Sequence, residues 1–154
     1  MKPTPNTKTC FPRGTDELEN EIKAMPKIDA FLNKNKEYLL KCSLPEHLNT
    51  LLSQKGIRIA DVVRGSQLDR VYVYQIFSGQ KTPSRDKLIA IAFGLKLSAD
   101  ETQKMLKLSG NRELYARDER DAVILFSLHH QNTLSDTNEL LFRHNFSVLG
   151  TPNA

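Results

Sequence analysis

Apolar residues recur at helical spacing through the middle of the chain, between clear start and stop signals. The run Ser43-Leu44-Pro45-Glu46 has the form of a capping box, and Gly56 is placed to close the helix that it opens. A second capping box, Ser98-Ala99-Asp100-Glu101, opens a helix that ends before Gly110. Because no pair of candidate strands interrupts this punctuation, the sequence predicts an all-α fold. Its central helices are predicted over residues 43–55, 57–64, 69–78, 84–95 and 98–108.

The stretch VYVYQIFSG, residues 71–79, begins with the alternation of a strand, yet it also fits a helix. Asp69 can accept free backbone N–H groups of a first helical turn, and Gly79 can end the helix. A lone strand would have no partner here, whereas the β-propensity of Val and Tyr costs a helix only tenths of a kcal/mol per residue. A helix is therefore predicted, with Val73, Ile76 and Phe77 inward and with an opposite face made of Arg70, Val71, Tyr74, Gln75 and Ser78.

Helical extensions flank this central region on both sides. Residues 1–14, with three prolines, are typical of a flexible tail, and residues 15–42 form a predicted N-terminal helical extension. Its helices are predicted over residues 16–25 and 27–40, separated by Pro26. This pair is interpreted as a packing or dimerising element.

Residues 111–150 form a predicted C-terminal helical extension. A long helix is predicted over residues 112–128, where charged residues give way to a nearly continuous apolar run, so much of it should be buried. A final helix begins at Thr133-Leu134-Ser135-Asp136 and carries Leu140, Leu141 and Phe142. We expect both helices to pack on the fifth central helix and on the N-terminal pair, or on a second subunit.

Composition describes a chain able to form a core, with 39% hydrophobic and 26% charged residues. No apolar run approaches roughly 18 residues, the length of a transmembrane helix, and the N-terminus lacks the apolar stretch of a signal peptide. Cys10 and Cys42 give no disulfide framework, so a reducing, cytoplasmic setting is expected. The net charge of +4, with a small basic excess in the first half, permits an anionic partner without establishing one.

Patterns for catalysis and metal binding are weak. His129 and His130 are adjacent, so on a helix they point about 100° apart and cannot share a metal as an i, i+4 pair does. His47 and His144 have no cysteine or carboxylate at metal-ligand spacing. The acidic residues of segment 117–121 lie among arginines and are interpreted as a solvated, salt-bridged turn. We expect neither enzymatic activity nor a cofactor or metal.

One part of the pattern is family-specific. Lys55-Gly56 closes the first central helix, and the run Ile76-Phe77-Ser78-Gly79-Gln80-Lys81-Thr82-Pro83-Ser84 begins 20 residues after that glycine, with Leu68 as the apolar residue of the turn between. On these landmarks residues 43–97 resemble the lambda-repressor-like, XRE-type helix-turn-helix domain. The resemblance implies a five-helix domain over residues 43–110.

Further segments widen the resemblance. RDKL at residues 85–88, LSADET at 97–102 and RDERDAVI at 117–124 are similar to a group of small helix-turn-helix proteins of Gram-positive bacteria and their mobile elements. This wider similarity implies bacterial origin and a distinctive C-terminal extension, and it indicates little about the target.

The resemblance implies that residues 69–78 form a recognition helix in the major groove of double-stranded DNA. A guanidinium binds guanine O6 and N7, a carboxamide does the same with adenine, and valine can touch a thymine methyl group. The residues expected against bases are Arg70, Val71, Tyr74 and Gln75. The residues expected against backbone phosphate, where contacts position the domain without reading sequence, are Tyr72, Ser78 and Lys81.

Some positions differ from the usual pattern of the family. Ile59 occupies the place of a phosphate-binding glutamine, and Gln67 occupies the place of the turn glycine, so we expect a turn of different shape. Phe77 replaces a glutamate that pairs with an arginine of the first helix, which suggests an apolar contact instead. Asp69 also brings negative charge close to the expected path of the phosphates.

Alternative interpretations stay open for single residues and for the whole chain. Arg70 either reads bases or pairs with Asp69 or Asp61 at the surface, and Tyr72 either reaches DNA or covers the edge of the core. The chain is predicted to be a sequence-specific DNA binder, as in bacterial transcriptional regulators, or else an all-helical adaptor that binds protein. The flanking helices are the natural surface for a homodimer, and a monomer with a thicker core is the alternative.

Overall fold

The computed structural model describes residues 15–34 and 43–150, and all regular secondary structure within these two ranges is helical. The all-α fold class is therefore confirmed. The chain divides into two compact units between Ser43 and Leu44, next to the predicted boundary of the central domain. The predicted tail over 1–14, both cysteines and the last residues of the helix predicted over 27–40 lie outside the described residues.

The first unit contains two short helices. α1 (Thr15–Ala24) carries two acidic residues in its first turn, where negative charge suits the positive end of the helix dipole. α2 (Ile28–Lys34) follows after the break at Pro26, as predicted. Phe31 is buried, whereas Ile28 and Leu32 on the same helix are exposed.

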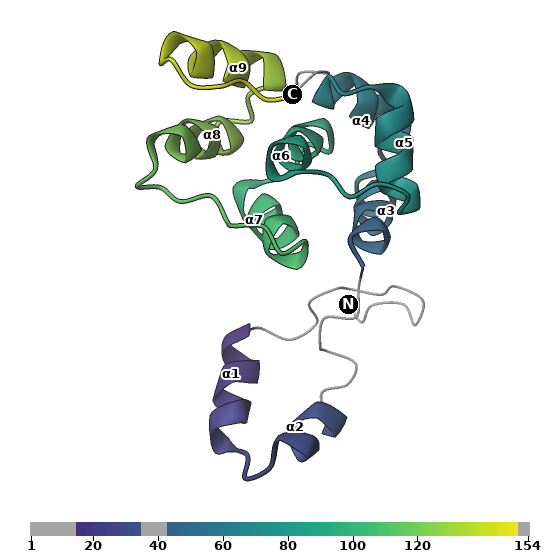
Figure 1. Cartoon of the computed structure of the whole chain (residues 1–154), viewed down its shortest axis with the longest axis vertical. Helices are drawn as coiled ribbons and strands as arrows, with labels where there is room; N and C mark the ends of the chain where they lie inside the picture. The colour runs from purple at the N-terminus through teal and green to yellow at the C-terminus, as the bar shows by residue number, and fades with distance from the viewer. Residues whose placement is uncertain (1–14, 35–42, 151–154) are drawn as a thin grey trace. The chain divides into compact units, whose positions relative to one another are not determined.

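The second unit is built around α6 (Arg85–Gly94), which Figure 1 shows at its centre, with α3, α4 and α5 on one side and α7, α8 and α9 on the other. Every residue from Leu88 to Leu95 is buried, so α6 is apolar on all its sides. The surrounding helices are α3 (Leu44–Lys55), α4 (Ile59–Ser66), α5 (Arg70–Ser78), α7 (Ala99–Leu108), α8 (Glu119–His129) and α9 (Leu134–Arg143).

Two glycines allow α4 and α6 to cross at backbone contact. A Cβ atom added at Gly65 would lie 2.8 Å from the Cα atom of Gly94, and one added at Gly94 would lie 2.7 Å from the carbonyl oxygen of Val62. Real Cβ atoms do not approach so closely, so neither glycine can carry a side chain without moving a helix. The prediction of a helix over 57–64, which would end before Gly65, is wrong at this end because Gly65 lies inside α4.

The start and end of α4 also differ from the helix predicted over 57–64. The helix begins at Ile59 because the Asp61 side chain accepts the backbone N–H of Arg58, at 3.2 Å. The helix ends at Ser66, and its C-cap is Gln67, which adopts the left-handed conformation with φ 55° and ψ 22°. A glutamine thus takes the backbone conformation that a turn glycine usually supplies. Leu68 then turns inward and is buried, as predicted.

The helix predicted over 112–128 is wrong in its first half, because α8 begins only at Glu119. The Gln103 side chain both donates to the Leu114 carbonyl and accepts the Leu114 N–H, at 2.8 and 2.7 Å. The N–H of Tyr115 donates to the Asp121 carboxylate at 3.0 Å. Side chains from elsewhere in the fold therefore bind backbone groups that a helix would have used.

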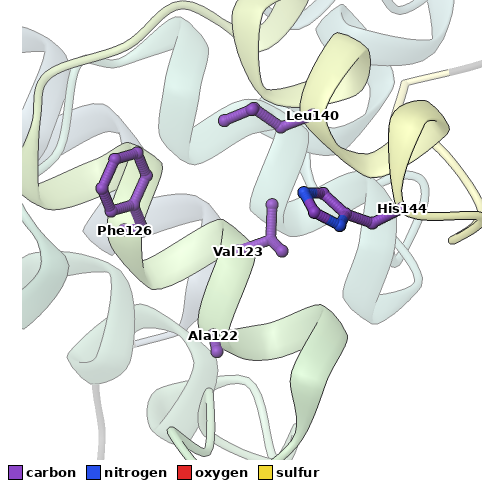
Figure 2. A pocket seen from close by; sticks show the side chains of 5 residues that line it. All are labelled: Ala122, Val123, Phe126, Leu140 and His144. Carbon is purple, nitrogen blue, oxygen red and sulfur yellow. The ribbon is translucent and has the colours of Figure 1, made fainter.

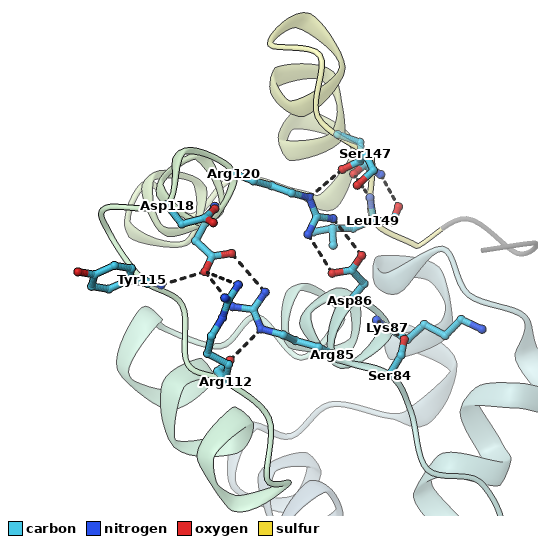
Figure 3. A network of polar contacts seen from close by, with 12 residues as sticks. Ser84, Arg85, Asp86, Lys87, Arg112, Tyr115, Asp118, Arg120, Ser147 and Leu149 are labelled. Atoms are coloured by element: carbon cyan, nitrogen blue, oxygen red, sulfur yellow. Dashed lines mark hydrogen bonds and ion pairs between the residues drawn. The ribbon is translucent and has the colours of Figure 1, made fainter.

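A crossed pair of ion pairs ties α8 to α6, as Figure 3 shows. Arg85 donates both terminal nitrogens to Asp121, at 2.9 and 3.3 Å, while Arg120 donates two nitrogens to Asp86, at 3.0 and 3.1 Å. Asp121 is only 1% exposed. The interpretation of segment 117–121 as a solvated turn is therefore wrong, because the carboxylate of its last residue is buried and links two helices.

The C-terminal helices belong to the same unit as the central ones. α8 packs on α7, the fifth central helix, as expected, whereas α9 packs on α8 and on α6 instead. Ile124, Leu128 and Leu141 are buried, but Phe126 and Phe142 are exposed, so the expected burial holds for one face. No helix within the described residues is long and apolar enough to cross a membrane.

Gly65→Ala tests the helix crossing. An alanine in an ordinary helix interior is more stable than glycine by roughly 0.5–1 kcal/mol. Here the new Cβ meets backbone, so we expect the free energy of unfolding in urea to fall by about 1–3 kcal/mol. Ser53→Ala, on an exposed position of α3, is the control and should shift it by less than about 0.5 kcal/mol. A gain in stability for Gly65→Ala would contradict the crossing.

Asp121→Ala tests the link between α6 and α8. It leaves the Arg85 guanidinium, which is only 18% exposed, without its carboxylate partner. Removing one member of a buried pair costs about 3–5 kcal/mol, and we expect a loss in this range by urea denaturation. Glu119→Ala, an exposed change in the same helical turn, should be nearly neutral. Equal effects of the two changes would show that the pair adds no stability.

Candidate nucleic-acid interface

α5 is fixed at both ends by local signals. The Asp69 carboxylate accepts the N–H of Tyr72 at 3.2 Å, which caps the first turn as predicted. Gly79 ends the helix with φ 86°, and its N–H donates to carbonyl oxygens of the last turn. The side chain of Asn49 on α3 donates to the Phe77 carbonyl at 3.0 Å. α5 is therefore a short helix with little freedom to fray at either end.

The buried side of α5 locks its rotation. Val73 and Ile76 are fully buried and Phe77 is 4% exposed, so the predicted inward face is confirmed. Phe77 makes the apolar contact expected of it. Because this face is seated in the core, the opposite face has one fixed orientation toward solvent.

The opposite face carries most of the residues singled out in the sequence. Arg70 and Ser78 are exposed, Val71 is 63% exposed and Tyr74 is 42% exposed. Lys81 is exposed in the following loop, where its own N–H donates to the Gln75 carbonyl at 3.2 Å. The structure thus brings these side chains to the solvent side of one helix and its C-terminal loop. The two predicted residues that are only half-exposed are Tyr72 and Gln75.

The Arg70 side chain lies over an aromatic ring. Its guanidinium carbon is 5.8 Å from the centroid of the Tyr74 ring, one turn along the helix. Arg70 makes no ion pair with any described residue, so the alternative of a pair with Asp61 or Asp69 is not found. The guanidinium is held near the helix and keeps its hydrogen-bonding groups open to a partner.

Tyr72 covers the edge of the core, which was one of its two interpretations. Burial raises the pKa of its hydroxyl. The ammonium group of Lys87, on the first turn of α6, lies 4.5 Å from the centroid of the Tyr72 ring. This places a second cation beside α5. Lys87 was not among the residues predicted from the sequence, because only its tertiary contact with Tyr72 brings it beside α5.

Two arginines, one at the N-cap of α4 and one in its last turn, share a single carboxylate, which leaves one net positive charge. Arg58 and Arg64 both pair with the Asp61 carboxylate, Arg58 at 3.6 Å. The N–H of Arg58, with the two guanidinium groups beside it, lowers the pKa of the Asp61 carboxyl. Ile59 packs against the core and offers no hydrogen bond in the place of the family's glutamine. The cations without an ion-pair partner around α5 are therefore Arg70, Lys81 and Lys87, as far as the described residues go.

A shallow apolar groove of about 360 Å³ lies between α8 and α9. Figure 2 shows the side chains that line it, which are Ala122, Val123, Phe126, Leu140 and His144. The His130 ring stacks on Phe126 with their centroids 4.0 Å apart. Within the described ranges, no three His, Cys, Asp or Glu residues are grouped to hold a metal ion. This groove has no polar group suited to chemistry other than an imidazole.

Comparisons with known proteins leave these observations to stand alone. No protein-family model matches the chain, and neither the curated proteins nor the solved structures contain a match to it. The side chains on and beside α5 are therefore the basis for assigning a function.

Proposed function

We propose that the chain binds double-stranded DNA in a sequence-specific manner, with α4 and α5 as a lambda-repressor-like helix-turn-helix and α5 in the major groove. One observation carries the proposal. α5 is capped at both ends, seated in the core by Val73 and Ile76, and presents Arg70, Val71 and Tyr74 to solvent from one rigid helix. A helix of this kind has the width and rigidity for the major groove.

The exposed side chains supply contacts suited to base edges. Arg70 offers a guanidinium for the O6 and N7 atoms of guanine, and its place over Tyr74 reduces the freedom lost on binding. Val71 offers a methyl-sized apolar contact for thymine, and Tyr74 offers a hydroxyl. Gln75 is half-buried, so its part in reading adenine requires a rotation of its side chain outward.

Phosphate contacts come from the ends of α5 and from α6. Lys81 follows the helix, and Lys87 reaches the side of α5 that Tyr72 covers. Ser78 is exposed, with its hydroxyl donating to the Gln75 carbonyl at 3.1 Å. Together these groups can anchor the backbone on either side of the bases. Regulation of bacterial transcription is the role that follows from the resemblance, and a symmetric dimer would double the contacts.

A protein-binding adaptor is the second candidate. The exposed face of α5 holds an apolar and an aromatic residue beside a single cation, which is a composition also found at protein interfaces. The groove between α8 and α9, with exposed Phe142 on α9, adds apolar surface far from α5 along the chain. An adaptor would bind through these surfaces and would not respond to duplex DNA.

A salt titration of duplex binding separates the two functions. DNA ligands are first selected from a pool of random duplexes with the full chain. With three cations free of ion pairs, the slope of log K against log salt should be about −2 to −3, and Kd should rise by about 40-fold between roughly 50 and 200 mM salt. Absence of duplex binding at low salt for every sequence would contradict DNA reading and would favour the adaptor.

Arg70 variants test base reading against simple charge. Arg70→Ala should weaken the selected duplex by about 1–3 kcal/mol and relax the preference at one base pair, measured by fluorescence anisotropy on single-base substitutions. Arg70→Lys keeps the charge and should relax the preference while the salt slope stays nearly constant. Arg143→Ala, which removes an exposed cation at the far end of α9, is the control. Unchanged preference in both Arg70 variants would contradict its role.

Asp69 variants distinguish the stability that the helix cap provides from the effect of its negative charge on duplex affinity. Asp69→Asn keeps a good cap and removes a negative charge next to α5, so stability should stay within about 0.5 kcal/mol of wild type. Duplex affinity should rise, because the repulsion of phosphate is removed. Asp69→Ala removes the cap as well and should cost about 0.5–2 kcal/mol in urea denaturation. An unchanged or lower duplex affinity for Asp69→Asn would contradict the repulsion of phosphate by Asp69.

A further inference from the structure

A segment after α9 folds back across the second unit and is fixed there by side chains. We call residues 146–150 the C-terminal strap. The Asn138 carboxamide holds it by donating to the Leu149 carbonyl and accepting the Leu149 N–H, both at 2.7 Å. Arg120 donates to the Ser147 carbonyl at 3.1 Å, as Figure 3 shows. Leu149 is 1% exposed, so the strap is part of the core rather than a loose end.

The strap ends against the turn that joins α4 to α5. A Cβ atom added at Gly150 would lie 2.7 Å from the carbonyl oxygen of Ser66, the last residue of α4. The start of α9 touches the next residue, since the Gln67 carboxamide donates to the Ser135 hydroxyl at 2.6 Å. Two separate parts of the C-terminal extension therefore meet two consecutive residues, the last residue of α4 and the first residue of the turn.

Gly150 is suited to this contact for two reasons. Its φ of 72° lies in the left-handed region, which favours glycine. The same hypothetical Cβ would also lie 2.9 Å from Cδ2 of Leu134, so no side chain fits between the strap, α9 and α4. The backbone of the strap is thus too close to Ser66 for any side chain at position 150.

We propose that the strap and the first turn of α9 position the α4–α5 turn and thereby set the affinity of α5 for DNA. The proposal rests on the proposed function. α5 is joined to α4 by a three-residue turn, so a shift at Ser66 or Gln67 is passed directly to the N-terminus of α5, where Arg70 lies. Base contacts depend on placement to within a fraction of an ångström, so a loose turn weakens them. The strap thereby holds the end of α4, and with it the N-terminus of α5, in a fixed position.

Asn138→Ala in the full chain is the test variant, because it removes both hydrogen bonds to Leu149 and alters nothing on α4 or α5. Asn111→Ala is the matched control, since it removes a half-buried asparagine that bonds Ser109, away from the turn. Asn138→Asp is the partial variant, because a carboxylate still accepts the Leu149 N–H but cannot donate to the Leu149 carbonyl. Amide hydrogen exchange at residues 66–68, without DNA, reports the turn. Fluorescence anisotropy on the selected duplex reports affinity.

The expected result couples the two readouts at a temperature where all variants are folded. Asn138→Ala should exchange the amides at 66–68 faster and should bind the duplex about 2- to 30-fold more weakly, the range for residues that touch neither ligand. Its salt slope should match wild type, because no phosphate contact is lost. Asn138→Asp should fall between the two, and Asn111→Ala should match wild type in both readouts.

Three outcomes overturn the proposal, and they are distinguishable. Duplex affinity of Asn138→Ala equal to that of wild type would overturn the positioning role while DNA binding by the chain stands. The same holds if affinity falls without any change in exchange at residues 66–68, because the loss would then not pass through the turn. A wild-type chain that binds no duplex would overturn the proposed function, and this inference with it.

Discussion

The close crossing of α4 over α6 is the constraint on which the second unit depends. α6 is buried on all sides, and Gly65 and Gly94 let the α4 backbone rest directly on it. The position of α4 determines where its last turn lies, and only three residues then lead to α5. A side chain at either glycine would move the turn, the exposed face of α5 and the contact with Gly150 at once. Backbone contact, rather than side-chain interlocking, therefore sets the geometry of the candidate interface.

The C-terminal extension is an integral part of this arrangement. The ion pairs of Arg85 with Asp121 and of Asp86 with Arg120 join the first turn of α6 to the first turn of α8. From there α9 and the segment after it return to the end of α4. The second unit therefore closes on itself through long-range polar contacts, which are more specific in geometry than apolar packing alone. α5 therefore packs on α3 and α4, and the end of α4 is in turn contacted by α9 and by Gly150.

Local signals in the sequence were sufficient for most helices and for the orientation of α5. Asp69, Ser84, Ser98 and Thr133 cap their helices as the pattern predicts, because a cap involves residues only a few positions apart. The pattern mispredicted the start of the helix over 112–128, because side chains distant in sequence bind backbone groups there. The Gln103 carboxamide, for example, binds both backbone groups of Leu114. It also misjudged Gly65, since a glycine that ends a helix and one that admits a neighbouring backbone look alike in sequence. The exposure of Arg70, Val71 and Tyr74 was predictable, whereas Lys87 required the tertiary contact with Tyr72.

The contact between Ser66 and Gly150 has a consequence for synthesis on the ribosome. The two residues are 84 positions apart. At typical elongation rates, about 4–17 s separate the translation of the turn from that of the glycine that backs it. During that interval α5 has been synthesised, but the segment that contacts the end of α4 has not. The pairing thus makes the completed second unit a late event in the life of each molecule.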